Sequence, residues 1–255
     1  MKPIVKSSLK LGGFGLVLYL VFLVILFPAS LGWKLAPDSI KRQVQITGIQ
    51  GRIWNGSAQG LIVNRNDLGK LSWTLSPWAL LTGSASGSFI IDREPEALTG
   101  DYRVSGPGKF TLSNVDLRMQ GESLEQLTRP FVLHGSITAS FDAIRYSSGE
   151  TLHLDGTVNL NYTKVEGLQD IQLGDIEARV QPEGNGSIAS FTNKASPLDI
   201  QGKVEMNPNG QMNLTLGLMN QDRTRKDLDN MLAVIGKPDV SGRVTLNYRQ
   251  RIRLP

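Results

Sequence analysis

The chain has 255 residues and no cysteine, so disulfide bridges, Cys-based zinc sites and thiol nucleophiles are excluded. Its 27 Lys and Arg residues are interspersed with 23 Asp and Glu residues, which gives a net charge of +4 and no basic patch of the kind that nucleic acid requires. We therefore expect no nucleic-acid partner.

An uncharged apolar segment lies between Lys10 and Lys34. Residues 11–33 are long enough for a transmembrane helix, which needs about 20 mostly apolar residues. Trp33 stands where an interfacial aromatic anchor is expected. The alternative is a cleaved signal peptide, but a signal core usually has about 7–15 residues. We therefore predict a retained single span.

The charges around this segment are nearly balanced, because three lysines precede it and Lys34, Lys41 and Arg42 follow it. Long domains are translocated largely regardless of their charge. We therefore predict a cytoplasmic tail at residues 1–10, a transmembrane helix at residues 11–33, and a single β-rich domain outside the cytoplasm at residues 34–255.

Alternation of apolar and polar residues dominates the remainder of the chain. Leu71, Trp73 and Leu75 alternate with Ser72 and Thr74, as in a half-buried strand. Asn55-Gly56 is a hairpin turn signal. Residues 77–83 predict one short helical turn, with Pro at its first position and Gly after its end.

A glycine repeatedly stands in phase with the apolar residues that follow it, as in Gly156-Val158-Leu160-Tyr162. The phase slips after Leu112, which predicts a bulge near Asn114. Because glycine permits tight bends, we predict a mainly β fold: a strongly curled, mostly antiparallel sheet with one or two short helices. These helices are expected at residues 122–128 and at residues 222–235, the second capped by Asp222.

Side chains suited to catalysis do not gather anywhere in the sequence. His134 and His153 are the only histidines, each within a strand pattern, and no serine stands in a Gly-x-Ser-x-Gly elbow. Acidic residues are scattered singly rather than clustered. We therefore expect no enzymatic activity, no catalytic residue, no cofactor and no metal.

Two sets of residues are candidates for binding rather than chemistry. Candidate partner contacts are three tryptophans, which could equally belong to a core, and three arginines, which could equally guard an exposed sheet edge: Trp54, Trp73, Trp78, Arg249, Arg251 and Arg253. The apolar phase of the strands lines either a packed core or a groove that holds acyl chains: Phe89, Ile91, Leu160, Tyr162, Val204 and Leu246.

Two blocks of sequence resemble a known family. One is Gly51-Arg-Ile-Trp-Asn-Gly-Ser-Ala58 followed by Leu68-Gly-Lys-Leu-Ser-Trp73-Thr-Leu-Ser-Pro77-Trp-Ala-Leu-Leu-Thr-Gly83. The other is Leu232-Ala-Val-Ile-Gly-Lys-Pro238 followed by Gly242-Arg-Val-Thr-Leu-Asn-Tyr248. With the N-terminal anchor and the total length, these blocks make the chain similar to protein N of the bacterial type II secretion system.

The resemblance implies a bitopic inner-membrane protein of Gram-negative bacteria with a periplasmic β-rich domain. Such a protein would assist the export of folded proteins across the outer membrane, in contact with other secretion subunits. The family also looks related to AsmA-like β-groove proteins, which implies lipid binding or transfer between membranes as the alternative. Between a packed scaffold and a lipid groove, the sequence favours the scaffold.

Overall fold

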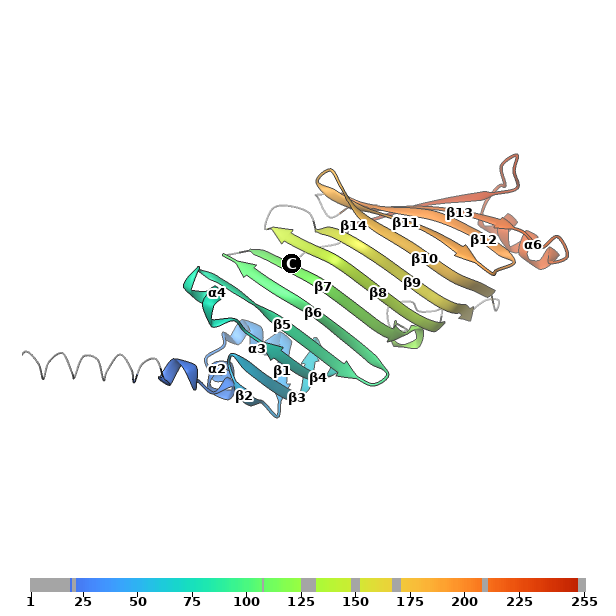
Figure 1. Cartoon of the computed structure of the whole chain (residues 1–255). Coiled ribbons are helices and arrows are strands. Elements are labelled where there is room, and N and C mark those ends of the chain that lie inside the picture. Colours follow the sequence, from blue (N-terminus) through green and yellow to red (C-terminus); the bar gives the residue numbers. More distant parts are fainter. Residues whose placement is uncertain are drawn as a thin grey trace, which may run out of the picture.

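One antiparallel sheet of 14 strands forms the body of the protein (Figure 1). The computed structural model describes residues 19, 22–106, 108–124, 132–147, 152–166, 171–207 and 211–251. The strands lie in chain order from β1 through β3 to β14, and β2 pairs with β3 beside this path. From β2 onward each strand pairs with the next one along the chain, which confirms the predicted antiparallel arrangement of the strands.

The strands and helices have the following bounds. The first seven strands are β1 (Val44–Thr47), β2 (Gln50–Arg52), β3 (Asn55–Val63), β4 (Asn66–Thr74), β5 (Ser84–Arg93), β6 (Glu96–Ser105) and β7 (Lys109–Gln120). The others are β8 (Val132–Ser147), β9 (His153–Glu166), β10 (Ile171–Glu183), β11 (Gly186–Lys194), β12 (Leu198–Met206), β13 (Gln211–Asn220) and β14 (Val244–Arg251). The helices are α2 (Ala29–Lys34), α3 (Asp38–Gln43), α4 (Pro77–Leu81), the 3₁₀ turn η1 (Gly121–Leu124) and α6 (Lys226–Ile235).

The register gives the sheet one apolar face. Directly paired residues share a face, so the pairs can be followed from strand to strand across the sheet. One such row runs unbroken through Ala58, Leu71, Ile91, Leu98, Leu117, Ala139, Val158, Ala178, Phe191, Gly202, Leu216 and Leu246. We call this side of the sheet the apolar face.

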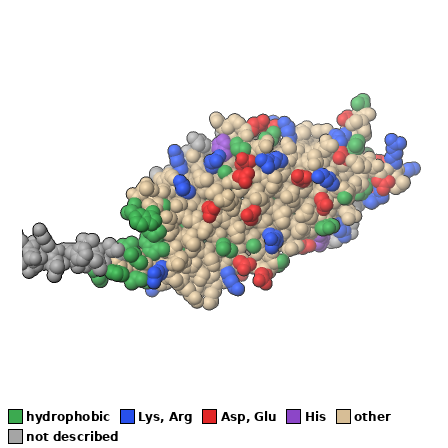
Figure 2. Space-filling view, in the orientation of Figure 1, with side chains coloured by type: hydrophobic (Ala, Val, Ile, Leu, Met, Phe, Trp, Pro, Cys, Tyr) green, Lys and Arg blue, Asp and Glu red, His purple; other side chains and the backbone are tan. Residues whose placement is uncertain are grey.

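The opposite side is polar. The neighbouring row consists of Ser57, Ser72, Ile90, Thr99, Asp116, Ser140, Thr157, Arg179, Ser190, Lys203, Thr215 and Asn247. Ile90 is the one hydrophobic residue in it. Figure 2 shows a broad surface on which acidic and basic side chains are interspersed and hydrophobic ones are few. The predicted alternation therefore describes both faces of the sheet.

Glycines of the apolar face lie beneath aromatic rings of adjacent strands. Phe89 pairs with Gly100, Phe141 with Gly156 and Phe191 with Gly202, and a Cβ on any of the three glycines would press against its partner's ring. Trp73 lies over Gly56 in the same way. These glycines leave room for the rings, so their main role is cross-strand packing.

The prediction of a strongly curled sheet is wrong. The sheet is open and twisted (Figure 1), and β1 and β14 are the first and last strands of its hydrogen-bonded order. Two of the glycines taken as bending points, Gly156 and Gly202, instead make room for the rings of Phe141 and Phe191 on adjacent strands. The protein exposes 17005 Å² of surface, whereas a compact monomer of 27.9 kDa exposes about 11,000 Å².

Two local predictions have different outcomes. The bulge near Asn114 is confirmed: Asn114 has φ 51°, and the register of β6 with β7 shifts between the pairs Thr99–Asp116 and Asp101–Ser113. The turn predicted at Asn55-Gly56 is wrong, because Arg52 pairs with Asn55 and the β2–β3 hairpin turns at Ile53-Trp54. Gly56 instead provides the space beneath the Trp73 ring.

The short helices are largely as predicted, with shifted bounds. α4 has Pro77 at its start, and Gly83 follows its end. The helix expected at residues 122–128 is the 3₁₀ turn η1 in its described part, and residues 125–128 lie outside the described residues. α2 and α3 precede the sheet, so the described chain has more short helices than the one or two expected.

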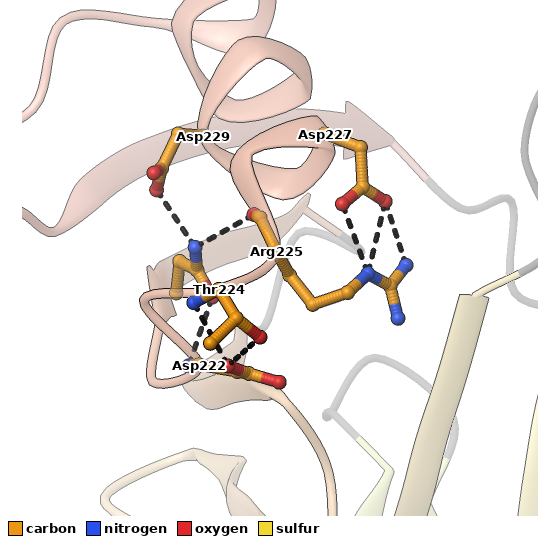
Figure 3. A network of polar contacts seen from close by, with 6 residues as sticks. Asp222, Thr224, Arg225, Asp227 and Asp229 are labelled. Atoms are coloured by element: carbon orange, nitrogen blue, oxygen red, sulfur yellow. Dashed lines mark hydrogen bonds and ion pairs between the residues drawn. The ribbon is translucent and has the colours of Figure 1, made fainter.

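The helix predicted at residues 222–235 begins later, at Lys226. The Asp222 carboxylate accepts hydrogen bonds from the Thr224 backbone N–H, at 3.0 Å, and from the Thr224 hydroxyl, at 2.6 Å. Asp222 therefore closes a turn ahead of α6 instead of capping it (Figure 3). Asn220 donates to the Arg225 carbonyl and to Asp229, which ties the first turn of α6 to β13.

The largest buried cluster lies between α6 and the last strands. Leu232 of α6 packs with four buried side chains of the sheet: Leu198, Ile200, Leu218 and Val244. Ile200, Leu218 and Val244 continue the apolar face at this end. α6 thus covers one end of the apolar face, and within the described ranges no other helix packs on β9–β14.

The N-terminal segment is described only in part, since residues 1–18, 20 and 21 lie outside the described residues. The predicted tail, residues 1–10, and much of the predicted span therefore lie outside the described residues. Residues 22–25 are helical, Pro28 is extended with ψ 138°, and α2 begins at Ala29. In the part of the chain that the structure describes, no helix is long and apolar enough to cross a membrane.

The glycine–aromatic pairs generate a first prediction. Gly202→Val should lower the free energy of unfolding by about 1–3 kcal/mol, because the new side chain would overlap the Phe191 ring. Gln201→Val, on the exposed polar face of the same strand, should change it by less than about 0.5 kcal/mol. Guanidinium unfolding of the full chain, followed by circular dichroism, measures both. Removing the ring by Phe191→Ala should restore part of the loss; equal effects of Gly202→Val with and without the ring would contradict the packing role.

A second prediction concerns α6. Leu232→Ala should cost about 2–5 kcal/mol of unfolding free energy, because Leu232 is buried in the largest cluster. Hydrogen exchange of α6, β13 and β14 should accelerate, while the distant strands β5–β7 keep their protection. Val234→Ala, at an exposed position of the same helix, is the control. Protection of β13 and β14 that survives Leu232→Ala would show that α6 does not stabilise this end.

Candidate interaction surfaces

Trp54 and Trp73 hold the N-terminal segment against the sheet. The Trp54 indole N–H donates to the Val24 carbonyl at 2.8 Å, and the Trp73 indole N–H donates to the Ile53 carbonyl at 3.1 Å. The Ile53 backbone N–H in turn donates to the Phe27 carbonyl at 3.0 Å. Both indoles therefore have structural partners inside the chain, which favours the core interpretation of these two residues.

Trp78 lies apart from the other two. It belongs to α4, and 77% of its surface is exposed. Leu81 of the same helix is exposed to the same extent, and Leu80 is exposed as well. Of the three candidate tryptophans, Trp78 alone is exposed enough for its ring to contact a partner.

Five of the six candidate lining residues lie on the apolar face. Ile91 and Leu246 belong to the row described above, and Phe89, Leu160 and Val204 occupy the same face of their strands. All five are half-buried. Their packing comes chiefly from neighbours within the sheet, so the apolar face is neither a closed core nor an enclosed groove.

Tyr162 does not lie with these residues. It has φ 54°, its side chain is 83% exposed, and its backbone N–H donates to Asp175 at 2.8 Å. The pairing of β8 with β9 shifts at this point, opposite Gly135. Because the bulge changes the phase, Thr163 instead of Tyr162 is buried. Val165, which stands out of phase with Leu160 and Tyr162, is the sequence signal that could have identified this bulge.

The predicted arginines lie on the terminal strand of the sheet. Arg249 and Arg251 are exposed on β14, and Arg253 lies outside the described residues. The Arg249 Nε donates to the Asn213 side chain of β13 at 3.1 Å. Arg249 is thus folded inward over β13 and does not cover the outer edge of β14.

A cavity of about 610 Å³ was not expected from the sequence. It opens at the end of the apolar face where β5 turns into β6. Its floor is apolar and its rim is charged: Ile91, Leu98, Leu117 and Met119 form the floor, and Arg65, Arg93, Glu96 and Glu122 stand at the rim. The rim residues come from three separate turns, so their spacing in the sequence carries no signal.

The carboxylates of this rim are ionised and paired. Burial disfavours the charged form of Glu96, but hydrogen bonds from Ser123 and Arg93 outweigh it, so the pKa of Glu96 lies below its usual value. A backbone hydrogen bond and a contact of 2.7 Å with His134 lower the pKa of Glu122. Neither group is poised to exchange a proton near neutral pH, which favours a binding role for the rim.

Metal binding has no support in the described ranges. Within them, no three His, Asp or Glu side chains are placed so that they could hold a metal ion together. The described surfaces suited to binding are therefore the apolar face with its charged rim, the exposed side chains of α4 and the edge strand β14.

Comparisons with known proteins agree with one another. The family model described as type II secretion system (T2SS), protein N matches residues 42–247. A type II secretion system protein N of Aeromonas hydrophila is 24% identical, covering 97% of this chain and 100% of the relative. One of Vibrio cholerae is 19% identical, covering 94% and 98%. No solved structure matches significantly. The chain belongs to the type II secretion system protein N family.

Proposed function

We propose that this chain is a non-enzymatic inner-membrane component of the type II secretion system. Residues 11–33 would anchor it, and residues 34–255 would lie in the periplasm. There it would assist the export of folded proteins across the outer membrane by contacting other secretion subunits. The supporting observation is that the family match, residues 42–247, coincides with the open sheet from β1 to β14.

The apolar face is the proposed contact surface. Large contiguous apolar surfaces that stay open to water are rare on monomeric proteins and mark sites of association. Here half-buried apolar side chains continue from β4 to β14, and among the described helices only α6 packs against the last strands. A secretion subunit that covered this face would remove it from water.

The edge of β14 is a second proposed contact. β14 has eight residues, whereas β1 at the opposite edge has four. Short edge strands are one way in which proteins prevent unwanted pairing, and β14 lacks this protection. An added strand could pair with its backbone. Arg251 and Arg253, with the positive charge of Arg249 on the neighbouring face, would favour a partner with acidic side chains.

Lipid binding is the alternative, and one observation favours it. The cavity at the end of the apolar face combines an apolar floor with a rim that carries Arg65 and Arg93. An amphipathic lipid has the same two parts, an acyl chain and an anionic headgroup. In this alternative the chain would bind or transfer lipid between the membranes.

A third prediction tests the contact role of the apolar face. Introducing Leu160→Asp together with Val204→Asp should abolish or strongly reduce secretion, because both carboxylates would be buried against the partner. Asn159→Asp with Gln201→Asp, on the polar face of the same two strands, should leave secretion unchanged. Secretion of a reporter enzyme at equal levels of each variant is the measurement. Normal secretion by the apolar-face variant would argue against the contact.

Since aspartates on this face could also disturb folding, crosslinking provides an independent readout. A photoreactive amino acid at Leu246 or Val204 should capture a secretion subunit in cells, whereas one at Gln201 should not. Equal capture from both faces would contradict a contact on the apolar face.

A fourth prediction separates the scaffold from the lipid carrier. If the apolar face contacts protein, the gently purified full chain and its Leu160→Asp, Val204→Asp variant should retain the same small amount of phospholipid in native mass spectrometry. If the face carries lipid, the unaltered chain should retain phospholipid stoichiometrically and the variant should lose it. The second result would replace the scaffold with the lipid carrier.

A further inference from the structure

α4 combines strong exposure with an apolar surface. Trp78 and Leu81 are each 77% exposed, and Leu80 is exposed beside them. Two hydrogen bonds fix the end of their helix: the Ala79 carbonyl accepts from the hydroxyls of Thr82 and Ser84, at 2.7 and 3.1 Å. The three large side chains are therefore held outward on a fixed turn.

The stretch of chain that contains α4 carries no charged residue. Between Lys70 and Asp92 the sequence contains no Lys, Arg, Asp, Glu or His. A protein-binding surface usually has a polar rim around its apolar centre, whereas a surface that enters lipid must avoid buried charge. The 21 uncharged residues 71–91 thus favour lipid over a protein partner.

The hairpin that holds the N-terminal segment also holds α4. Trp54 donates through its indole to Val24, and its backbone carbonyl accepts a hydrogen bond of 2.7 Å from the N–H of Leu75, two residues before α4. Exposed apolar residues of the N-terminal segment and of α4 consequently lie at the same end of the molecule, where hydrophobic side chains gather (Figure 2).

We propose that α4 is a second membrane contact, in which Trp78 and Leu81 enter the interfacial layer of the bilayer beside the N-terminal anchor. This inference rests on the proposed anchor in residues 11–33. Indole rings favour the interface because an apolar ring and a polar N–H meet the two sides of that layer. Two attachment points would set the orientation of the sheet on the membrane, which a single anchor would leave free.

The test uses the absence of cysteine from the chain. Trp78→Cys and Leu81→Cys, each labelled with an environment-sensitive nitrobenzoxadiazole probe, report on α4 in the full chain. Val240→Cys, at a fully exposed position beyond α6, is the matched control. The labelled proteins are placed in vesicles of phosphatidylethanolamine and phosphatidylglycerol with acyl chains brominated near the headgroup, and far-UV circular dichroism confirms that each variant is folded.

The probes at positions 78 and 81 should shift to shorter wavelength and be quenched several-fold more than the probe at position 240. Equal, weak quenching at all three positions in protein that floats with the vesicles would refute the α4 contact and leave the anchor standing. Protein that fails to float would refute both. A probe at position 78 that is shielded from water without lipid quenching would indicate a protein partner and would also overturn the proposal.

Discussion

Backbone hydrogen bonds between successive strands are the interaction on which the rest of this structure depends. A net contribution of about 1 kcal/mol for each bond is modest, but the ladder continues through the whole sheet. Where α6 packs, buried leucine, isoleucine and valine side chains add to it. Over the middle of the sheet, small groups of apolar side chains such as Val115, Ile137 and Val180 are buried, and most of the other apolar side chains are half-buried. This region is accordingly stabilised more by pairing between neighbouring strands than by packing against a second layer. Its apolar face therefore keeps the capacity to bind.

Much of this fold could be predicted from the sequence because strand periodicity is a local property. Alternation placed Phe89, Ile91, Leu160, Val204 and Leu246 on one face, and the slip after Leu112 revealed the bulge at Asn114. The bulge at Tyr162 is marked in the sequence only by Val165, which stands out of phase with Leu160 and Tyr162. The prediction of a strongly curled sheet was wrong for a different reason. Whether a glycine such as Gly100 or Gly202 bends the strand or makes room for an aromatic ring depends on the residue of the adjacent strand. Likewise, the start of α6 depended on a turn that Asp222 makes with Thr224.

The candidate sites were less predictable, because they depend on contacts between distant parts of the chain. The three candidate tryptophans have similar sequence contexts. In the structure, Trp54 and Trp73 donate to backbone carbonyls, whereas Trp78 is exposed. The charged rim of the cavity assembles Arg65, Arg93 and Glu122 from three turns. Family membership could be inferred from sequence blocks, since these contain the hairpin and helix signals that shape the sheet. The surface through which the protein binds its partners could not be inferred from these blocks.

The order of the strands has a consequence for distance. Thirteen strands lie on the path from β1 to β14, which makes twelve spacings of about 4.8 Å. Measured along the sheet, the two edges are thus separated by roughly 60 Å. The N-terminal segment is fastened beside the first edge, at Arg52 and Trp54. The length of the sheet therefore sets the distance between the attachment of the N-terminal segment and the place where β14, with its arginines, can contact another molecule.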